Sequence, residues 1–400
     1  MPVKTLPPLQ TQIQQTAAGL QNGPFSHLIA GAIQTAVSPY RVCPIGAHID
    51  HQGGPVLGVA IDAYTVLNFA PTADGLVYLT SSDFDQPISF TADAIPEKKH
   101  DWARYARGAV AALHQTFPNQ ISKGLVGNIS GRLLGAGLSS SASAGVAYLL
   151  GLATVNSIEL TRAELVELDR LIENEYLGLN NGIQDQTTIV FGGAGYLIHQ
   201  DTRQRIVTEI KHLPTVDNVA WLIIFSGFTR ELTSSGFNDR VAECWWAAEA
   251  LEPAAVILGD VSKEIYANQK NLLPGYLQRR AAHFFTECER VEAGANAWAA
   301  GDFGQFGSLM NQSCHSSIHQ YECGSQPLID LHHIALSTSG VLGSRFSGGG
   351  YGGCLVALAD KRQAADAIEN ILKQYRLMYP EKADVCDGWV ARGVNGAKIN

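Results

Sequence analysis

The stretch Gly135-Ala-Gly-Leu-Ser-Ser-Ser-Ala-Ser143 runs directly into a segment of small apolar residues, Ala142–Leu152. Glycines let the backbone approach a ligand closely, and a helix N-terminus presents free N–H groups with roughly half a positive charge. We therefore predict an anion site at the start of a buried helix; the alternative is a Ser-capped helix after a flexible turn. Because the chain has no Gly-x-x-x-x-Gly-Lys-Ser/Thr sequence, this stretch is not a Walker-type phosphate loop.

Two further Gly-rich stretches flank this one in the sequence. In residues 38–54, the polar side chains of Arg41, His48, Asp50 and His51 interleave with apolar residues before a Gly-Gly turn. Any one of them alone fits a capped turn with a surface ion pair, but the set favours a site. The other stretch, residues 347–354, contains Gly-x-Gly-x-x-Gly, yet a strand is expected after it where a dinucleotide-binding fold needs a helix.

The composition indicates a globular enzyme. With 400 residues, 46% hydrophobic and 16% charged, the chain can bury substantial cores and suits two domains. No apolar run approaches the roughly 18 residues that cross a bilayer, and residues 1–20 lack a signal-peptide core, so we expect a cytoplasmic protein without a membrane partner. The net charge of −9 argues against nucleic acid as a partner. Seven scattered cysteines without a Cys-x-x-Cys pair argue against disulfides or a Cys-based zinc site.

Apolar periodicity and turn residues predict mixed α and β structure. The expected strands are Val56–Ile61, Tyr64–Phe69, Val77–Thr80, Tyr196–His199, Val219–Phe225 and Gly353–Ala359. The expected helices are Trp102–Phe117 with Asp101 as its N-cap, Ala142–Leu152, Glu164–Leu177, Asn238–Leu251, Leu277–Ala300 and Ala364–Leu377. We place a domain boundary near residues 190–215, which gives an N-terminal domain of residues 1–200 and a C-terminal domain of residues 201–400.

Together, the three Gly-rich stretches resemble motifs of the GHMP small-molecule kinases and, within them, of the galactokinase branch. The galactokinase signature is recognisable in Arg41-Val-Cys-Pro-Ile-Gly-Ala-His-Ile-Asp50, the phosphate loop in residues 135–143 and the C-terminal motif in residues 343–354. Between them, Gly182-Ile-Gln-Asp185-Gln186 looks like the segment that carries the catalytic aspartate. The resemblance spans about residues 36–395 and implies an α+β, two-domain fold, with mixed sheets, helices packed on them and an active site in the cleft between the domains.

The resemblance implies a catalytic pair, Arg41 and Asp185, beside the hydroxyl that is phosphorylated. Phosphoryl transfer passes through a loose transition state, so a fixed guanidinium that offsets the charge of the transferring group is suitable chemistry. An aspartate near its ordinary pKa of about 3.9 is a weak base. We therefore expect Asp185 first to orient the sugar hydroxyl and only second to accept its proton; a solvated loop carboxylate is the alternative.

ATP and Mg²⁺ are the cofactors that the resemblance implies. The matching phosphate-loop residues are Gly135, Ala136, Gly137, Leu138, Ser139, Ser140 and Ser141. Ser141 and Glu173 match the family's Mg²⁺ ligands, whose hard oxygen atoms suit this ion. Trp102 matches an aromatic residue that flanks the adenine. Taken alone, Glu173 would more often be a solvated helix residue, and Trp102 fits a core position equally well.

Departures from the galactokinase pattern concern the sugar pocket. The resemblance implies a pocket made of Tyr40, Ala47, His48, Asp50, His51, Gly182 and Phe237. Where this chain has Ala47, galactokinases have a Glu that accepts a hydrogen bond from the hydroxyl on carbon 6 of the sugar. Two like charges about 4 Å apart repel by roughly 4 kcal/mol at an effective dielectric of 20. Losing that Glu makes room for a carboxylate at carbon 6.

The expected substrate is therefore D-galacturonate, phosphorylated at its anomeric hydroxyl, and residues 38–54 and 169–185 look specifically like those of plant galacturonokinases. A galactokinase or a kinase of a related sugar or uronic acid is the first alternative. A non-catalytic sugar-sensing regulator is the second. Candidates for binding the uronate carboxylate are Tyr40, His51 and Arg230, the last two by charge alone. The sequence does not distinguish a monomer from a homodimer.

Overall fold

The computed structural model describes residues 6, 8–131, 136–192, 196–201, 203, 206–211, 218–229 and 236–400. The strands are β1 (Gln34–Ile45), β2 (Val56–Pro71), β3 (Leu76–Ser81), β4 (Ile88–Thr91), β5 (Leu125–Ser130), β6 (Tyr196–Asp201), β7 (Ile206–Lys211), β8 (Val219–Phe225), β9 (Val341–Phe346), β10 (Cys354–Asp360), β11 (Asp387–Ala391) and β12 (Lys398–Ile399). The helices are α1 (Leu9–Gln21), α2 (Arg104–Thr116), α3 (Ser140–Val155), α4 (Arg162–Leu171), α5 (Gln184–Phe191), α6 (Phe237–Leu251), α7 (Lys263–Gln269), α8 (Gly275–Ala300), α9 (Phe303–His319), α10 (Gln326–Leu336) and α11 (Ala364–Met378).

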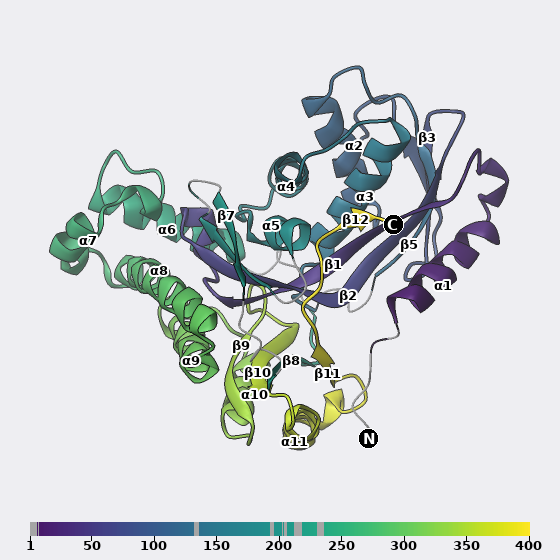
Figure 1. The fold of residues 1–400 in the computed structure, drawn as a ribbon. Coiled ribbons are helices and arrows are strands. Elements are labelled where there is room, and N and C mark those ends of the chain that lie inside the picture. The colour runs from purple at the N-terminus through teal and green to yellow at the C-terminus, as the bar shows by residue number, and fades with distance from the viewer. Residues whose placement is uncertain are drawn as a thin grey trace.

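The larger sheet has the strand order β12-β1-β2-β5-β3-β4, with the β6–β7 hairpin paired to β2. Its strands are antiparallel except for the parallel pair of β3 and β5. Helices α3 and α5 pack directly on β1 and β2, and α2 and α4 pack against α3 above them (Figure 1). The short strand β12 pairs with β1, Ala36 opposite Ile399, so the C-terminal segment returns to the first strand. Residues of β1 and of the helices α3 and α5 that pack on this sheet line the cleft described below.

The smaller sheet is antiparallel, in the order β11-β8-β10-β9, and α10 and α11 pack on it (Figure 1). The helix pair α8–α9 contacts both sheets, since α8 packs on β1 and β2 while α9 packs on β9. One buried core accordingly includes Tyr40 and Ile45 of β1, Trp298 of α8 and Val356 of β10. A second core lies between the larger sheet and α2–α3. The α8–α9 pair therefore links the two sheets at the loop that follows β1.

The predicted mixture of helices and strands is confirmed, with three local corrections. Val56–Ile61 and Tyr64–Phe69 are parts of one strand, β2, because Asp62 stays in the strand and its carboxylate accepts the N–H of Arg392 at 2.9 Å. Asp101 is not the N-cap of α2, because this helix begins at Arg104. The carboxylate of Asp101 instead accepts the N–H of Ala103 and pairs with the side chain of Arg107.

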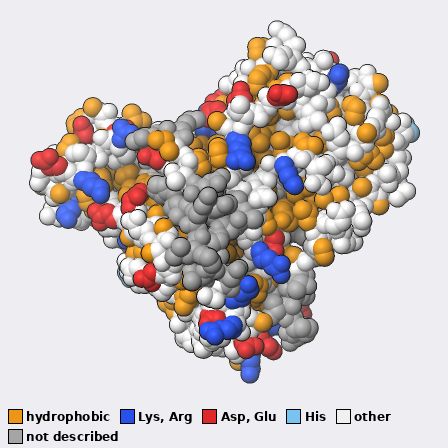
Figure 2. All heavy atoms as spheres, in the orientation of Figure 1, with side chains coloured by type: hydrophobic (Ala, Val, Ile, Leu, Met, Phe, Trp, Pro, Cys, Tyr) orange, Lys and Arg blue, Asp and Glu red, His pale blue; other side chains and the backbone are white. Residues whose placement is uncertain are grey.

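The third correction concerns the predicted helix Glu164–Leu177, which is α4 followed by a π-helical turn, Ile172–Tyr176. The β6–β7 hairpin belongs to the larger sheet and β8 to the smaller one, so the division into residues 1–200 and 201–400 stays a prediction. Among the described residues, no helix is long and apolar enough to cross a membrane. On the face drawn in Figure 2, Lys and Arg side chains are interspersed with Asp and Glu side chains.

Candidate active site

The three Gly-rich stretches meet at a cleft of about 960 Å³. It is lined by the end of β1 and the loop after it, the starts of α2, α3, α5 and α6, and the glycines of residues 348–352. The sequence-predicted site residues that line it are Arg41, Ala47, His48, Asp50, Trp102, Gly137, Ser139, Ser140, Ser141, Gly182, Asp185 and Phe237. The predicted site residues Gly135 and Arg230 lie outside the described residues.

An ion pair lies where the three Gly-rich stretches meet in the cleft. Arg41, buried in β1, places its Nε 2.6 Å from Oδ1 of Asp185 in the first turn of α5. Its Nη1 donates to the carbonyl of Gly137 and to the hydroxyl of Ser347, each at 3.2 Å. The second oxygen of Asp185 accepts a hydrogen bond from the Ser139 hydroxyl. Segments from all three Gly-rich stretches therefore fix the guanidinium and the carboxylate in one orientation.

The phosphate loop is shaped by two left-handed residues before α3. Gly137 has φ +73° and Ser139 has φ +56°. A Cβ at position 137 would lie 2.7 Å from the carbonyl oxygen of Ser347, so only glycine fits there. Ala136 and Leu138 are buried and join the loop to the sheets, since the N–H of Cys354 donates to Ala136 and that of Arg41 to Leu138. The loop thus turns the N-terminus of α3, with its unpaired N–H groups, into the cleft.

Glu173 lies buried in the π-helical turn behind the phosphate loop. The side-chain amides of Asn181 and Gln186 both donate to its Oε2. Burial, and next the charge of Asp185, raise the pKa of Glu173 to about 7, although hydrogen bonds from Asn181 and Ser141 oppose the shift. The hydroxyl of Ser141 and the carboxylate of Glu173 are therefore close together, as a shared cation would require. No cluster of three or more His, Cys, Asp or Glu side chains suited to a metal occurs among the described residues.

The glycine at position 145 on α3 is explained by its neighbour on α4. A Cβ at position 145 would collide with the carboxylate of Asp169 on α4. Burial raises the pKa of Asp169 well above its ordinary value, with Glu173 adding repulsion. The glycine therefore makes room for an acidic side chain that comes from the opposite helix.

Asp50 lies next to the Arg41–Asp185 ion pair. Its Oδ2 accepts the N–H of Gln184 at 3.3 Å, and a Cβ on Gly182 would collide with this carboxylate. Burial, and then the charge of Asp185, raise the pKa of Asp50 to about 6. Two carboxylates thus face the cleft, one from the turn after β1 and one from α5, and both can accept hydrogen bonds from hydroxyl groups.

His48 and Ala47 form the adjoining wall. His48 has φ +65°, stacks on Tyr321 with ring centroids 4.5 Å apart, and places Nε2 3.3 Å from Sγ of Cys323. Burial, and then the charge of Arg345, hold the pKa of His48 well below its usual value, so the ring is neutral. Phe237, in the first turn of α6, closes this part of the cleft.

Two residues that were predicted for the sugar pocket, Tyr40 and His51, do not line the cleft. Tyr40 is fully buried and does not line the cleft, because neighbouring residues in a strand point to opposite faces and Arg41 takes the cleft side. His51 bonds through Nε2 to the hydroxyl of Tyr321 at 3.1 Å, outside the cleft lining. Burial lowers the pKa of His51 to about 3, so it is neutral and supplies no charge for a carboxylate.

Trp102, also in the lining of the cleft, stacks on Phe84 with ring centroids 5.7 Å apart and planes 5° from parallel. Its Nε1 donates to the carbonyl of Gln86 at 2.9 Å. The indole is therefore held as part of a flat aromatic wall. Nothing in the sequence indicated Phe84 as a site residue. Ser347, whose hydroxyl contacts Arg41, was marked only by its place in the third Gly-rich stretch.

Comparisons with known proteins bear on both halves of the chain. The family model "GHMP kinases N terminal domain" matches residues 104–193, and "GHMP kinases C terminal" matches residues 295–377. Galacturonokinase from Arabidopsis thaliana is 40% identical over 385 residues, which cover 90% of this chain and 90% of that protein. Galactokinase from Roseiflexus sp. is 35% identical over 342 residues, covering 84% of this chain and 86% of that protein.

Solved structures give the same picture. Lactococcus lactis galactokinase complexed with galactose has a TM-score of 0.88 at 28% identity, covering 98% of this chain and 99% of that one. Mevalonate kinase from Methanococcus jannaschii has a TM-score of 0.64 at 18% identity, which shows the common fold alone.

Proposed function

Because this chain belongs to the GHMP kinases, in their galactokinase branch, we propose that it transfers the γ-phosphoryl group of ATP to the anomeric hydroxyl of D-galacturonate. Membership confirms the resemblance that the Gly-rich stretches predicted. An ATP-dependent sugar kinase follows from the family; galacturonate as its substrate, and the roles of single residues, are the proposal.

The observation that carries the proposal is the Arg41–Asp185 pair, held beside the N-terminus of α3. Helix N–H groups and the hydroxyls of Ser140 and Ser141 would bind the phosphates of ATP. Asp185 would orient the attacking hydroxyl and take its proton as the new O–P bond forms and the bond from the γ-phosphorus to the departing ADP breaks. Ser139 and Arg41 hold the carboxylate in place. The guanidinium of Arg41 would also offset charge on the transferring group, the largest contribution expected for this chemistry.

Mg²⁺ fits the residues behind the phosphate loop. Ser141 and Glu173 would hold it, because one hydroxyl and one carboxylate leave further positions for phosphate oxygens and water, which this ion prefers. When bound, Mg²⁺ neutralises phosphate charge and orients the terminal phosphate. The amides of Asn181 and Gln186 keep the Glu173 carboxylate in a fixed orientation for that role.

Galacturonate is favoured over galactose by one position and one relative. Ala47 lines the cleft with a methyl group, so no side-chain carboxylate repels the acid group of the sugar at that position. The Arabidopsis galacturonokinase matches more of this chain at higher identity than the Roseiflexus galactokinase does. Galactose remains the second candidate, because galactokinases are similar over most of the chain.

An ADP-release assay with galacturonate, glucuronate, galactose and arabinose side by side tests the proposal. We expect kcat/KM to be highest for galacturonate, and the product to resist reducing-sugar reagents because its anomeric carbon is substituted. Faster turnover of galactose would refute the substrate assignment alone. Sugar binding without any ADP release would refute the kinase and favour a sugar-sensing regulator.

A further inference from the structure

The loop that follows β1 and carries Ala47 and His48 is hydrogen-bonded to side chains of α8. We propose that His283 and Glu287 are positioning residues, which fix the Gly46–Ala47 backbone and so set sugar affinity without touching the sugar. This inference rests on the proposed sugar-kinase function. Neither side chain lines the described part of the cleft, whereas Ala47 and His48 do.

Two backbone groups of the Gly46–Ala47 segment, the N–H of Gly46 and the carbonyl of Ala47, are bound by side chains one turn apart on α8. The N–H of Gly46 donates to Oε1 of Glu287 at 2.7 Å, and Nε2 of His283 donates to the carbonyl of Ala47 at 3.0 Å. Residues four apart on a helix share a face, so the two anchors act together. A buried N–H or C=O left without a partner costs about 1–3 kcal/mol, which makes any other path of this backbone unfavourable.

The loop conformation needs such anchors. Gly46 has φ +100°, and a Cβ there would lie 2.7 Å from Cα of Val56. His48, two residues on, is also left-handed, which is uncommon for a residue with a side chain. External contacts therefore determine this conformation, because two of the three residues from 46 to 48 adopt backbone angles that most side chains disfavour.

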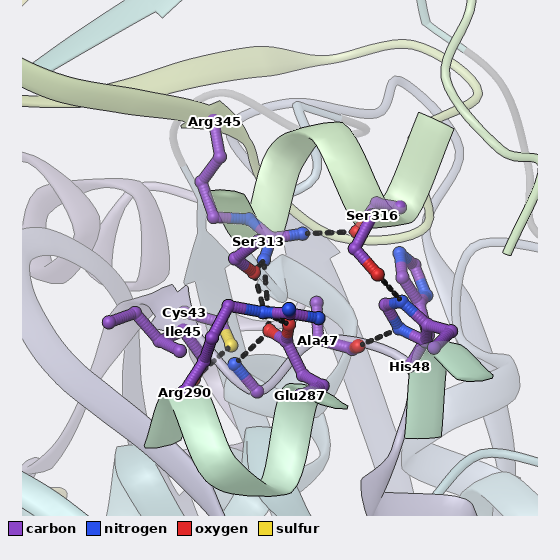
Figure 3. A network of polar contacts seen from close by, with 12 residues as sticks. Cys43, Ile45, Ala47, His48, Glu287, Arg290, Ser313, Ser316 and Arg345 are labelled. Carbon is purple, nitrogen blue, oxygen red and sulfur yellow. Dashed lines mark hydrogen bonds and ion pairs between the residues drawn. The ribbon is translucent and has the colours of Figure 1, made fainter. Parts of the chain in front are cut away.

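Glu287 is a charged acceptor although it is fully buried. Burial would raise its pKa, but chiefly the charge of Arg290, and also the charge of Arg345 and the hydrogen bond from Ser313, hold the pKa below its ordinary value. Nε of Arg290 lies 2.6 Å from Oε2, and Nη1 of Arg345 lies 3.8 Å from Oε1. Figure 3 shows Glu287, Ser313 and Arg345 pointing toward one another, with Ala47 alongside. The Gly46 contact is thus a charge-assisted hydrogen bond, the stronger kind.

His283 is a neutral donor. A carbonyl only accepts, so Nε2 carries the hydrogen that points to Ala47. Nδ1 lies 2.8 Å from the hydroxyl oxygen of Ser316 on α9, which orients the ring. Burial lowers the pKa of His283 to about 4, so this arrangement holds at neutral pH. The second helix of the pair therefore supports the contact that the first one makes.

The anchors act on one end of the cleft only. Contacts that hold the Arg41–Asp185 pair come from Ser139, Gly137 and Ser347. Those of His283 and Glu287 reach the loop that carries Ala47 and His48. Loss of an anchor should therefore weaken sugar binding and leave ATP binding unchanged, whereas a merely structural role would weaken both.

Two substitutions of His283 separate the contact from the side chain. In His283→Gln, the amide nitrogen can occupy the place of Nε2 and still donate to Ala47. In His283→Asn, the shorter amide reaches only the place of Nδ1 beside Ser316. KM for the sugar and KM for MgATP are measured with the other substrate saturating, using the sugar that wild type phosphorylates best.

We expect His283→Asn to raise the sugar KM by about tenfold, as the loss of one buried hydrogen bond implies, with the MgATP KM within twofold of wild type. His283→Gln should restore most of the sugar affinity. Glu289→Gln, on an exposed part of α8 where Glu289 lies 3.7 Å from Lys263, is the control and should change neither constant. Equal effects of His283→Asn and His283→Gln, or equal effects on both substrates, would overturn the inference.

If His283→Asn does not fold, Ser316→Ala is the substitute variant. Ser316→Ala leaves His283 in place but removes the hydroxyl that orients its imidazole ring. The sugar KM should then rise about threefold, and an unchanged sugar KM in folded Ser316→Ala would overturn the inference. Wild-type turnover is the separate test of the proposed function, so a failure of either claim is recognised on its own.

Discussion

The two ends of the cleft are built in different ways. At the phosphate-transfer end, Arg41, Gly137, Ser139, Asp185 and Ser347 contact one another directly, and each lies in a Gly-rich stretch or in the Gly182–Gln186 segment. At the sugar end, the residues that line the cleft are positioned by side chains of α8 and by residues just after α9.

The difference separates chemistry from specificity. Phosphoryl transfer needs a few charged groups at fixed positions, and the chain supplies them from short motifs. In the proposed function, sugar selection would depend on the path of residues 46–51, which Glu287, His283, Tyr321 and Cys323 restrain. Changes at the transfer end should therefore abolish turnover of every sugar, while changes at the sugar end should alter the preference among sugars.

The largest effect is expected at the transfer end. Asp185→Asn and Arg41→Ala should each lower kcat by about a hundredfold or more, because both groups act mainly in the transition state. Folding should survive, which circular dichroism and thermal unfolding would show. Asp360→Asn, which removes the exposed Arg362–Asp360 pair, is the control and should have normal kcat. Near-normal turnover of Asp185→Asn would remove this residue from the catalytic site.

At the sugar end, Ala47→Glu should shift the preference from galacturonate toward galactose. A like-charge clash of about 3 kcal/mol would lower kcat/KM for galacturonate by roughly a hundredfold. Galactose should improve somewhat, because its hydroxyl gains a charge-assisted hydrogen bond. Ala47→Gln, equal in size but uncharged, is the matched control and should harm galacturonate less. A ratio of kcat/KM values within threefold of wild type in folded Ala47→Glu would show that Ala47 does not face carbon 6.

A smaller effect is expected behind the phosphate loop. Glu173→Ala should raise the Mg²⁺ concentration needed for half-maximal activity by about tenfold, since one of two protein ligands is lost. Glu167→Ala, on the preceding helix α4, changes a carboxylate that pairs with Arg170, and should leave the Mg²⁺ titration unaltered. An unchanged titration of Glu173→Ala would contradict the metal assignment.

The smallest effect concerns stability and pH. The pKa of Asp50 is raised to about 6 in the folded protein. The folded protein therefore binds the proton of this carboxyl more tightly than the unfolded chain does. Stability from this group is present at about pH 4 and is lost as the pH rises toward 6. Asp50→Asn should therefore increase the free energy of unfolding at pH 8 by about 1 kcal/mol, a figure reduced because Asp50 is partly exposed.

Denaturant unfolding of both proteins at pH 4, 6 and 8 measures this difference, which should shrink as the pH falls. The same substitution should weaken sugar binding, since the ionised carboxylate is the better acceptor. A gain in stability at pH 4 as large as at pH 8 would mean that the raised pKa of Asp50 is not its cause.

The transfer end could be predicted from the sequence because its residues belong to local patterns. Glycine at 137 and at 182 marks places where a Cβ would collide with a neighbouring group, and such positions stand out in a sequence. The anchors of the sugar end carry no such mark. His283 and Glu287 lie in a helix whose apolar spacing looks like that of any core helix, and their partners precede them by more than two hundred residues.

Side-chain direction was the other source of error. Tyr40 and His51 adjoin true cleft residues in the sequence, and proximity alone placed them in the pocket. Alternation along β1 sends Tyr40 into the core, and the turn after Asp50 sends His51 toward Tyr321. The gap expected between the strands Val56–Ile61 and Tyr64–Phe69 is not there, because Asp62 continues the strand and accepts the N–H of Arg392, a residue distant in the sequence.

The pairing of β12 with β1 has a consequence for synthesis. At about 5–20 residues per second, Ile399 leaves the ribosome tens of seconds after Ala36, its partner in the sheet. During that time the edge of the strand that carries Arg41 has backbone groups without their final partners, and such an edge can pair with another nascent chain. Chaperone dependence and yield of this protein should therefore respond to changes in its last few residues, far from the cleft.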